Sequence, residues 1–172
     1  MAGGVKFKDY SIEVEEALND TSIAWLHEAA NEIAAQAQRT TSTEDWTTEE
    51  RTRLRDNYRA EVDESKGKAM IGTPLEEGYW EEWGTGEYAA HGDGRKGWWV
   101  FIRGQASQGG GKNDSTREEA EEAAAFLRRV KGLDAVVTNG RRPNYTLERS
   151  FEKKQGWAKD LLADMLKERM DK

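Results

Sequence analysis

The sequence predicts an α+β fold, in which a small, mostly antiparallel sheet packs against a long N-terminal helix and a C-terminal helix, with a further helix inserted. Three observations carry this prediction. Apolar residues recur at helical spacing over 21–39, the run 96–103 is rich in β-prone residues, and the stretch 71–99 combines tryptophans with many glycines. The 172 residues can bury one core, so we expect a single domain over 1–172.

The composition excludes several classes of protein. A formal net charge of −7 disfavours general binding to nucleic acid, because the phosphate backbone is neutralised by lysine and arginine. The absence of cysteine excludes disulfides and thiolate metal sites. No apolar run approaches the roughly 20 residues of a membrane span, and the first residues lack the apolar block of a secretory signal. We therefore expect a soluble protein that is made in a cytoplasm.

The N-terminal part is expected to contain a short strand over 5–7, a helix over 11–18 and a longer helix over 21–39. Residues 19–22 read Asn-Asp-Thr-Ser, which are all N-cap formers, so the longer helix is expected to begin there. Its apolar residues follow one another at intervals of three and four, which places them on one helical face. They are Ile23, Leu26, Ala30, Ile33 and Ala37.

The next segment contains a capping box that starts at Thr47, in the order Thr-Thr-Glu-Glu. The box favours a short helix through Leu54, but 53–62 is equally compatible with a strand, and propensity does not decide between them. Residues 62–71 are predicted to form two strands around a turn at 64–67.

A sharply turned corner is predicted after these strands. Pro74 suits the start of a short helix, and Gly84 suits its end in a left-handed conformation. Leu75, Tyr79 and Trp83 recur every four residues, so we expect them on one face of this helix.

The part after the corner is expected to begin with a strand over 96–103 and a flexible, glycine-rich loop over 104–114. A capping box at 115–118, Ser-Thr-Arg-Glu, predicts a helix that runs to Lys131 and stops at Gly132. The residues expected on its inner face are Ala120, Ala124, Leu127 and Val130.

The C-terminal part is expected to contain a strand over 135–138, a turn at 139–140 and a final helix that starts at Pro143. Gly156 inside this helix predicts a bend or a close contact, because glycine costs about 1 kcal/mol there relative to alanine. The residues expected near one face are Leu147, Phe151, Ala158, Leu161, Leu162 and Met165.

The glycine-rich corner offers two candidate binding sites. The tripeptide Gly-Thr-Gly at 84–86 lacks the spacing of a phosphate-binding loop and a long apolar strand before it, so we interpret it as a structural turn. The stretch 92–97 lacks the alternating acidic ligands of a calcium loop. We interpret it as a hairpin tip, with Arg95 and Lys96 as candidate contacts to a partner.

Glutamates, histidines and tryptophans provide the remaining candidates. Paired carboxylates occur in glycosidases, but Glu76, Glu77, Glu81 and Glu82 on one short helix are expected to form a solvated face. The histidines at 27 and 91 lie far apart in the sequence, so we expect surface roles for both and no metal site. Four tryptophans are expected in the core, with a smaller share facing a neighbouring subunit. These are Trp80, Trp83, Trp98 and Trp99.

Two runs, 62–76 and 79–99, are similar to the tail-completion proteins of long-tailed bacteriophages, also called head–tail joining or neck proteins. In that family a strand leads to a short helix ending in Glu-Phe-Gly-Thr-Gly or Glu-Tyr-Gly-Thr-Gly, and residues 82–86 read Glu-Trp-Gly-Thr-Gly. A later Arg-Pro leads into the closing helix of the family, and 142–143 occupies that place. The run Ala-Ala-Asn-Glu-Ile at 29–33, with the following Ala-Gln-Ala-Gln, is also similar.

The resemblance implies a structural, non-enzymatic protein of the virion, located at the neck or the top of the tail and assembled in the host cytoplasm. It implies a homo-oligomeric ring, hexameric in the particle, whose isolated chain is a monomer. DNA would pass through this ring without sequence-specific binding, and the neighbours would be the phage connector or stopper and tail proteins, with no cofactor, metal or membrane. The residues expected to shape the subunit or its interfaces are Trp80, Trp83, Gly84, Thr85, Gly86, Tyr88, Arg95, Lys96, Trp98, Trp99, Arg142 and Pro143.

Two features depart from the family pattern. The Asp-Thr-Gly that usually follows the first long helix is absent, and 104–138 is longer than the expected short hairpin. We interpret 104–138 as an insertion that consists of a flexible loop and a helix.

From the residues alone, two alternative functions stay open: a small hydrolase that uses the glutamate-rich helix, and a regulatory protein-binding module.

Overall fold

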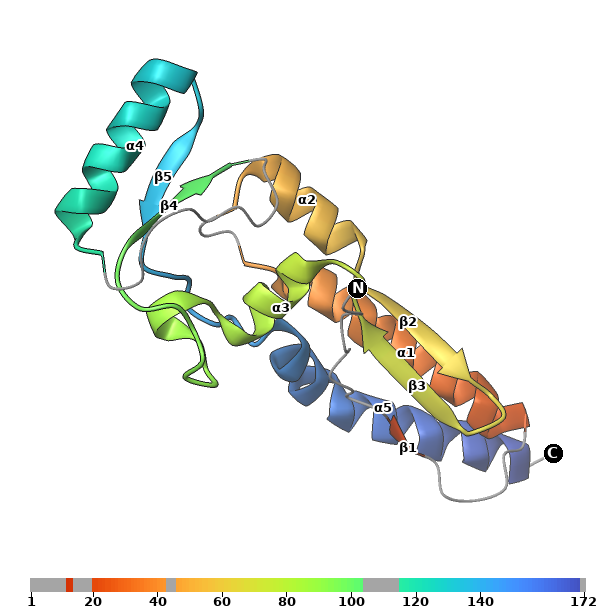
Figure 1. Ribbon diagram of the computed structural model, residues 1–172. Helices are drawn as coiled ribbons and strands as arrows, with labels where there is room; N and C mark the ends of the chain where they lie inside the picture. The colour runs from red at the N-terminus through yellow and green to blue at the C-terminus, as the bar shows by residue number, and fades with distance from the viewer. Residues whose placement is uncertain (1–11, 14–19, 43–45, 104–114, 171–172) are drawn as a thin grey trace. The chain divides into compact units, whose positions relative to one another are not determined.

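The computed structural model describes residues 12–13, 20–42, 46–103 and 115–170 (Figure 1). The strand expected over 5–7 and the loop expected over 104–114 lie outside these residues and stay predictions. The helix expected over 11–18 is wrong at the two of its residues that are described. Ile12 and Glu13 pair with a strand instead, which fixes them in an extended conformation.

The chain divides into two compact units, and each contains helices and strands. The first unit comprises Met1–Glu82 and Asn144–Lys172, and the second comprises Trp83–Pro143. Among the described residues all strand pairs are antiparallel and lie in two sheets, so the predicted α+β class is confirmed. The expectation of one domain with an insertion at 104–138 stays a prediction.

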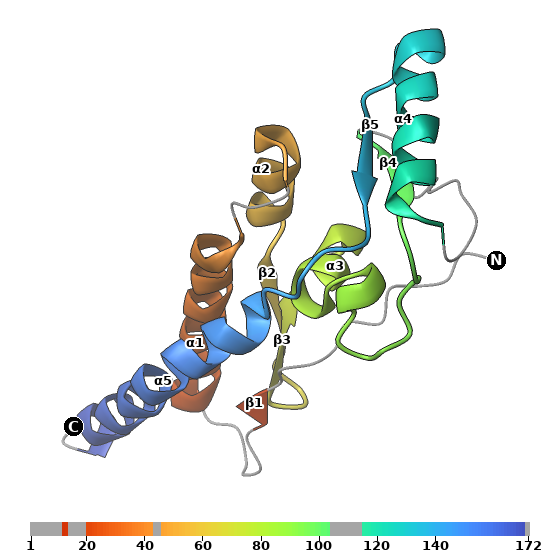
Figure 2. The ribbon, with the colours of Figure 1, turned by 90° about the vertical axis from the view of Figure 1, so that its left-hand side faces the viewer.

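Helix α1 (Asp20–Thr40) is the centre of the first unit. It packs against α5 (Thr146–Met170) and against the sheet of this unit (Figures 1 and 2). Trp25, Leu26 and Ile33 are buried, and so are four alanines of the same helix. The helix predicted over 21–39 is therefore confirmed.

The sheet of the first unit has three strands in the order β1-β3-β2. These are β1 (Ile12–Glu13), β2 (Arg59–Asp63) and β3 (Lys68–Gly72). Strands β2 and β3 form the hairpin that the sequence predicts around 64–67, with Val62 opposite Ala69. Alternate residues of the hairpin face α1, because successive side chains of a strand point to opposite faces.

Helix α2 (Thr48–Asp56) has the predicted capping box. The Glu50 amide donates to Thr47 Oγ1 at 3.2 Å, and the Thr47 amide donates to Glu50 Oε2 at 3.0 Å. Because the helix runs to Asp56 and β2 begins at Arg59, both alternatives for 53–62 are correct in part.

The core of the first unit joins α1, β3 and α5. Trp25 Nε1 donates to the carbonyl oxygen of Ala158 at 2.6 Å, which ties α1 to α5 inside this core. Small side chains at the α1–α5 contact let the two helices approach closely. The buried residues of the cluster are Trp25, Leu26, Ala29, Ala30, Ile33, Ala34, Ala69, Ile71 and Ala158.

Helix α5 differs from its prediction at two points. It begins at Thr146 and not at Pro143, because the Asn144 amide donates to the Glu81 carbonyl at 2.8 Å and Tyr145 has a φ of 51°, so the chain before Thr146 is not helical. Of the two alternatives for Gly156, the close contact is wrong, since a Cβ atom there would meet no other atom within 4 Å, and the bend stays a prediction.

The second unit is built on strands β4 (Trp99–Ile102) and β5 (Ala135–Thr138), which pair with Val100 opposite Val137. Helix α4 (Arg117–Lys131) connects them and packs on one face of the pair. Its buried cluster consists of Val100, Ala124 and Ala135, with Leu127 and Val137 against it.

Both ends of α4 are set by local contacts, but two predictions about this helix are wrong. The N-cap is Thr116, whose Oγ1 accepts from the Glu119 amide at 3.3 Å, so the capping box lies one residue later than predicted. Ser115 is not the N-cap, because its carbonyl oxygen accepts from the Trp98 amide at 2.9 Å and this bond holds Ser115 outside the helix. Gly132 ends the helix at a φ of 62° as expected, but Val130 is 58% exposed and does not belong to the inner face.

Candidate functional site: the glutamate and glycine corner

Helix α3 (Glu76–Trp83) carries two buried carboxylates at its end. Glu81 is 0% exposed, and at least four donors converge on it. Its Oε1 accepts from the Ser42 amide at 2.6 Å, from Asn144 Nδ2 at 2.9 Å and from Thr146 Oγ1 at 3.0 Å, and its Oε2 accepts from Trp46 Nε1 at 2.9 Å. One carboxylate thus fastens the end of α1, the approach to α2 and the start of α5.

Glu82 binds the first turn of α5. Its Oε2 accepts from the Leu147 amide at 2.7 Å and its Oε1 from the Glu148 amide at 3.1 Å. The first amides of a helix have no intrahelical acceptor and carry the positive end of the helix dipole. Glu82 therefore acts as the cap of a helix that starts 64 residues later in the sequence.

The expectation of a solvated glutamate face is wrong for Glu81 and Glu82. The face expected from Leu75, Tyr79 and Trp83 is wrong as well, since Tyr79 is 44% exposed and the buried residues of α3 are Gly78, Glu81 and Glu82. One signal in the sequence could have indicated that Glu81 and Glu82 are not part of a solvated face. Two acidic residues in the last turn of a helix oppose its dipole, which indicates that their charges serve another element.

The chemistry of these carboxylates is structural. The carboxylate oxygens of Glu81 and Glu82 accept hydrogen bonds from backbone and side-chain donors of the first unit, and these bonds hold each carboxylate in one position. Glu77 forms an ion pair with Arg53 on α2. A general acid or base needs an oxygen that can reach a substrate, and this arrangement directs the oxygens of Glu81 and Glu82 to the protein itself.

The Gly-Thr-Gly turn belongs to the second unit and lies against residues 139–143. The Thr85 amide donates to the Arg141 carbonyl at 2.9 Å, and the Glu87 amide donates to the Asn139 carbonyl at 2.9 Å. Gly84 has a φ of 71° and ends α3 in the expected left-handed conformation. Gly86 has a φ of 61°, and a Cβ atom there would lie 2.3 Å from the Asn139 carbonyl oxygen. Only glycine fits this approach.

The four tryptophans of the corner are all partly exposed, and none belongs to a buried core cluster of the described residues. Their expected place in the core is therefore wrong. These tryptophan rings lie at the surface instead. Cationic side chains lie over two of them, which is a favourable cation–π arrangement. The Arg95 guanidinium lies 5.2 Å from the Trp99 ring, and that of Arg117 lies 5.2 Å from the Trp98 ring.

The other predicted contact residues surround the same turn in the second unit. The Arg142 guanidinium lies 5.2 Å from the Tyr88 ring, Lys96 is exposed, and Pro143 packs beside Gly84. Their roles as interface residues stay predictions. Sequence reasoning missed Ser42, Trp46, Asn144 and Thr146, because only the fold brings them to Glu81.

The two histidines belong to different units, His27 to the first and His91 to the second. His27 Nε2 is 2.9 Å from Glu64 Oε1, and the His91 ring is 4.7 Å from the Trp83 ring. Within the residues that the structure describes, no three histidine or acidic side chains converge as metal ligands. None of the described helices is long and apolar enough to cross a membrane.

Comparison with known proteins identifies the class as a bacteriophage tail component. A family model with the description "Bacteriophage HK97-gp10, putative tail-component" matches residues 6–91, which is half of the chain. The chain belongs to the HK97-gp10-like family. The matched part contains α1, the three-stranded sheet, α3 and the Gly-Thr-Gly turn. No curated protein and no solved structure matches the chain.

Proposed function

We propose that this protein is a tail-completion, or head–tail joining, protein of the phage neck, with a structural and not an enzymatic role. The observation that carries the proposal is membership in a family of phage tail components over residues 6–91. Helix α3 within that part supports it, because the buried carboxylates of Glu81 and Glu82 hold elements of the subunit together.

The proposed protein works as a homo-oligomeric ring at the joint between the connector or stopper and the tail. Such a ring needs heterologous contacts, in which one surface of a subunit meets a different surface of the next, and six copies would close it. The proposed contact residues are those of the corner that are partly or fully exposed, together with the glycines that shape it. They are Trp80, Trp83, Gly84, Thr85, Gly86, Tyr88, Arg95, Lys96, Trp98, Trp99, Arg142 and Pro143.

The net charge of −7 fits a ring through which DNA passes without being held. An acidic surface repels the phosphate backbone, so DNA would slide through the channel without sequence-specific binding. A ring with a strongly positive lumen would contradict this part of the proposal. The proposed site of assembly is the host cytoplasm, and the proposed final location is the virion.

The proposal is tested by imaging particles from a phage that lacks this protein. We expect filled heads without tails beside free tails, because neither half can join without the neck. Complementation with the wild-type chain should restore tailed particles, and complementation with an unrelated phage protein should not. Normal tailed virions in the absence of the chain would overturn the proposal.

A further inference from the structure

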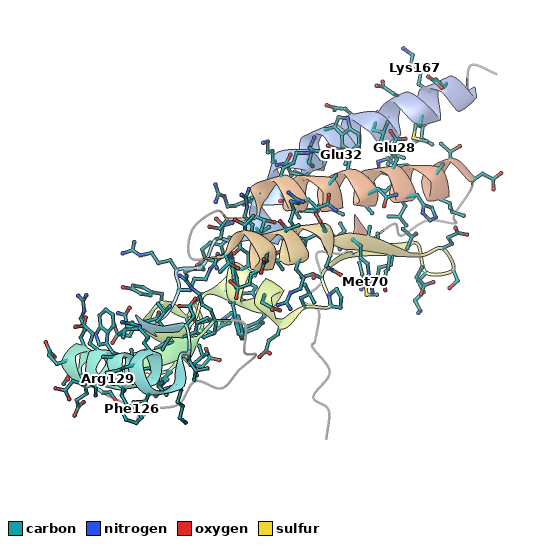
Figure 3. All side chains as sticks on the ribbon, turned by 90° about the horizontal axis from the view of Figure 1, so that it is seen from above. Glu28, Glu32, Met70, Phe126, Arg129 and Lys167 are labelled. Carbon is teal, nitrogen blue, oxygen red and sulfur yellow. The ribbon has the colours of Figure 1, made fainter. Side chains whose placement is uncertain are left out.

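Helix α4 buries one face in the second unit and leaves large apolar side chains on the other. Ala120, Ala124 and Leu127 face the strands, whereas Phe126 is 51% exposed and Val130 is 58% exposed. Phe126 and Arg129, both labelled on α4 in Figure 3, are exposed to solvent. Exposed apolar groups gathered on one helix indicate a contact surface and not a random scatter.

The spacing of these residues defines a stripe. Exposed Ala123 lies three residues before Phe126 and Val130 lies four residues after it, so the three side chains share one helical face. Glu122 lies four residues before Phe126 and Arg129 lies three after it. At about 100° per residue, these two charges stand only about 20° apart and border the same side of the stripe.

This charge pattern is complementary to itself. If two α4 helices pack antiparallel with Phe126 near the centre, Glu122 of each helix meets Arg129 of the other, and both pairs are attractive. In a parallel two-fold arrangement the charged flanks of the two helices would lie on opposite sides of the contact, so Glu122 of one copy would not meet Arg129 of the other. We propose that the exposed face of α4 binds the same face of a second copy of this chain, with Phe126 as the apolar anchor.

The proposed contact has two-fold symmetry, so it uses the same surface on both copies and is distinct from the heterologous contacts of a ring. Helix α4 also lies outside residues 6–91, which the family model matches. The inference therefore goes beyond the proposed neck function and predicts that the isolated chain is a dimer, where the resemblance implies a monomer.

Sedimentation velocity of the full chain tests this, over concentrations from about 1 µM to about 200 µM, the range in which weak dimers dissociate. We expect a monomer–dimer equilibrium in the wild type. Phe126→Asp should raise the dissociation constant at least about tenfold, because it places a charge at the centre of the contact. Glu122→Arg alone and Arg129→Glu alone should each weaken the dimer by creating like-charge pairs.

The double variant that combines Glu122→Arg with Arg129→Glu is the decisive control, since it restores opposite charges with the partners exchanged. It should dimerise more tightly than either single variant. Asp160→Arg, at an exposed position on α5, is the matched control and should leave the equilibrium unchanged. A wild type that is monomeric throughout, an oligomer that survives Phe126→Asp, or a double variant no better than the singles would each overturn the proposal.

Discussion

At the scale of single residues, two carboxylates that the sequence predicts to be solvated, those of Glu81 and Glu82, are buried and hold α3 in place. Burying a charge is costly unless donors compensate for the lost water. Glu81 has at least four such donors, and Glu82 accepts from the first amides of α5. Their position in the last turn of α3 is unfavourable for that helix, but it brings negative charge to the start of another.

Replacement of Glu82 by glutamine tests the capping role. The glutamine side chain would keep one acceptor oxygen, lose the charge and turn an amide donor toward donors of the helix. We expect Glu82→Gln to lower the free energy of unfolding by about 2 kcal/mol, the loss typical of hydrogen bonds to a charged group. Glu152→Gln, an exposed carboxylate on α5, should change it by less than about 0.5 kcal/mol. Urea unfolding followed by circular dichroism measures both, and equal effects would contradict the capping role.

Two glycines with similar φ angles separate the cost of a left-handed backbone from the cost of steric crowding. Gly86 has a φ of 61° and Gly92 a φ of 71°, but a Cβ at Gly86 would lie 2.3 Å from the Asn139 carbonyl oxygen, whereas at Gly92 nothing lies within 4 Å. Gly92→Ala should therefore show the conformational cost alone. Gly86→Ala should cost at least about 1 kcal/mol more, because the backbone must move apart. Thermal unfolding of both variants tests this, and similar losses would show that the turn tolerates a side chain.

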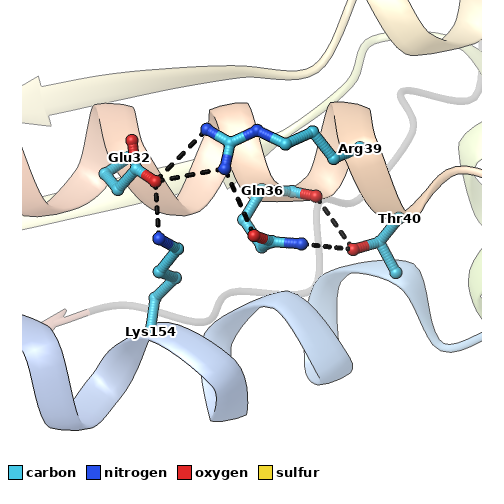
Figure 4. Close-up of polar contacts among 5 residues, drawn as sticks. All are labelled: Glu32, Gln36, Arg39, Thr40 and Lys154. Atoms are coloured by element: carbon cyan, nitrogen blue, oxygen red, sulfur yellow. Dashed lines mark hydrogen bonds and ion pairs between the residues drawn. The ribbon is translucent and has the colours of Figure 1, made fainter.

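At the scale of elements, helices α1 and α5 are joined by an ion cluster as well as by the core. Glu32 Oε1 accepts from Lys154 Nζ at 2.6 Å and from both terminal nitrogens of Arg39 at 3.2 Å (Figure 4). The hydrogen bond from Lys154, with the positive charges of Lys154 and Arg39, holds the pKa of Glu32 below its ordinary value of 4.5. The cluster is partly exposed, so its contribution to stability is less than about 1 kcal/mol.

This lowered pKa sets the sign of a pH dependence. A carboxylate with a depressed pKa in the folded state stabilises the fold at neutral pH, and this stabilisation fades as the pH falls below 4.5 and through the lowered pKa. Wild type should thus be more stable than Glu32→Gln at pH 7, and the difference should shrink toward pH 3. Urea midpoints at both pH values measure it. A difference that grows on acidification would contradict the role of this cluster.

Helix α5 can be stabilised at Gly156. This glycine lies in the helix interior with open space around its Cα, so alanine adds helix propensity without a clash. Gly156→Ala should raise the free energy of unfolding by about 0.5–1 kcal/mol. The contrasting variant is Gly78→Ala in α3, where a Cβ would meet Thr73 Cγ2 at 2.1 Å, and it should destabilise. If Gly156→Ala destabilises in thermal unfolding, an unrecognised requirement for glycine exists at this position.

Elements defined by local chemistry could be predicted from the sequence, and those defined by distant partners could not. The capping box at Thr47, the hairpin around 64–67 and the stop at Gly132 follow from neighbours in the chain. The start of α5 does not, because its cap is Glu82. The network around Glu81 escaped prediction for the same reason, since its donors include Asn144, 63 residues away in the sequence.

At the scale of the whole molecule, the family match and the segment that we interpret as an insertion, 104–138, fall on different parts of the chain. Residues 6–91 carry α1, the hairpin, α3 and the Gly-Thr-Gly turn, and this part of the chain matches a family of phage tail components. Strands β4 and β5 with helix α4 follow that part, and they form their own sheet and core cluster. We propose that the first part supplies the common role of the family and that α4 supplies an additional contact.

The most direct test of the central claim, that this chain is a structural part of the neck, is a cryo-electron microscopy reconstruction of the assembled virion. The account predicts a closed ring of copies of this chain between the connector and the tail, with the DNA path through its centre. A virion whose neck density is fully accounted for by other proteins would contradict it.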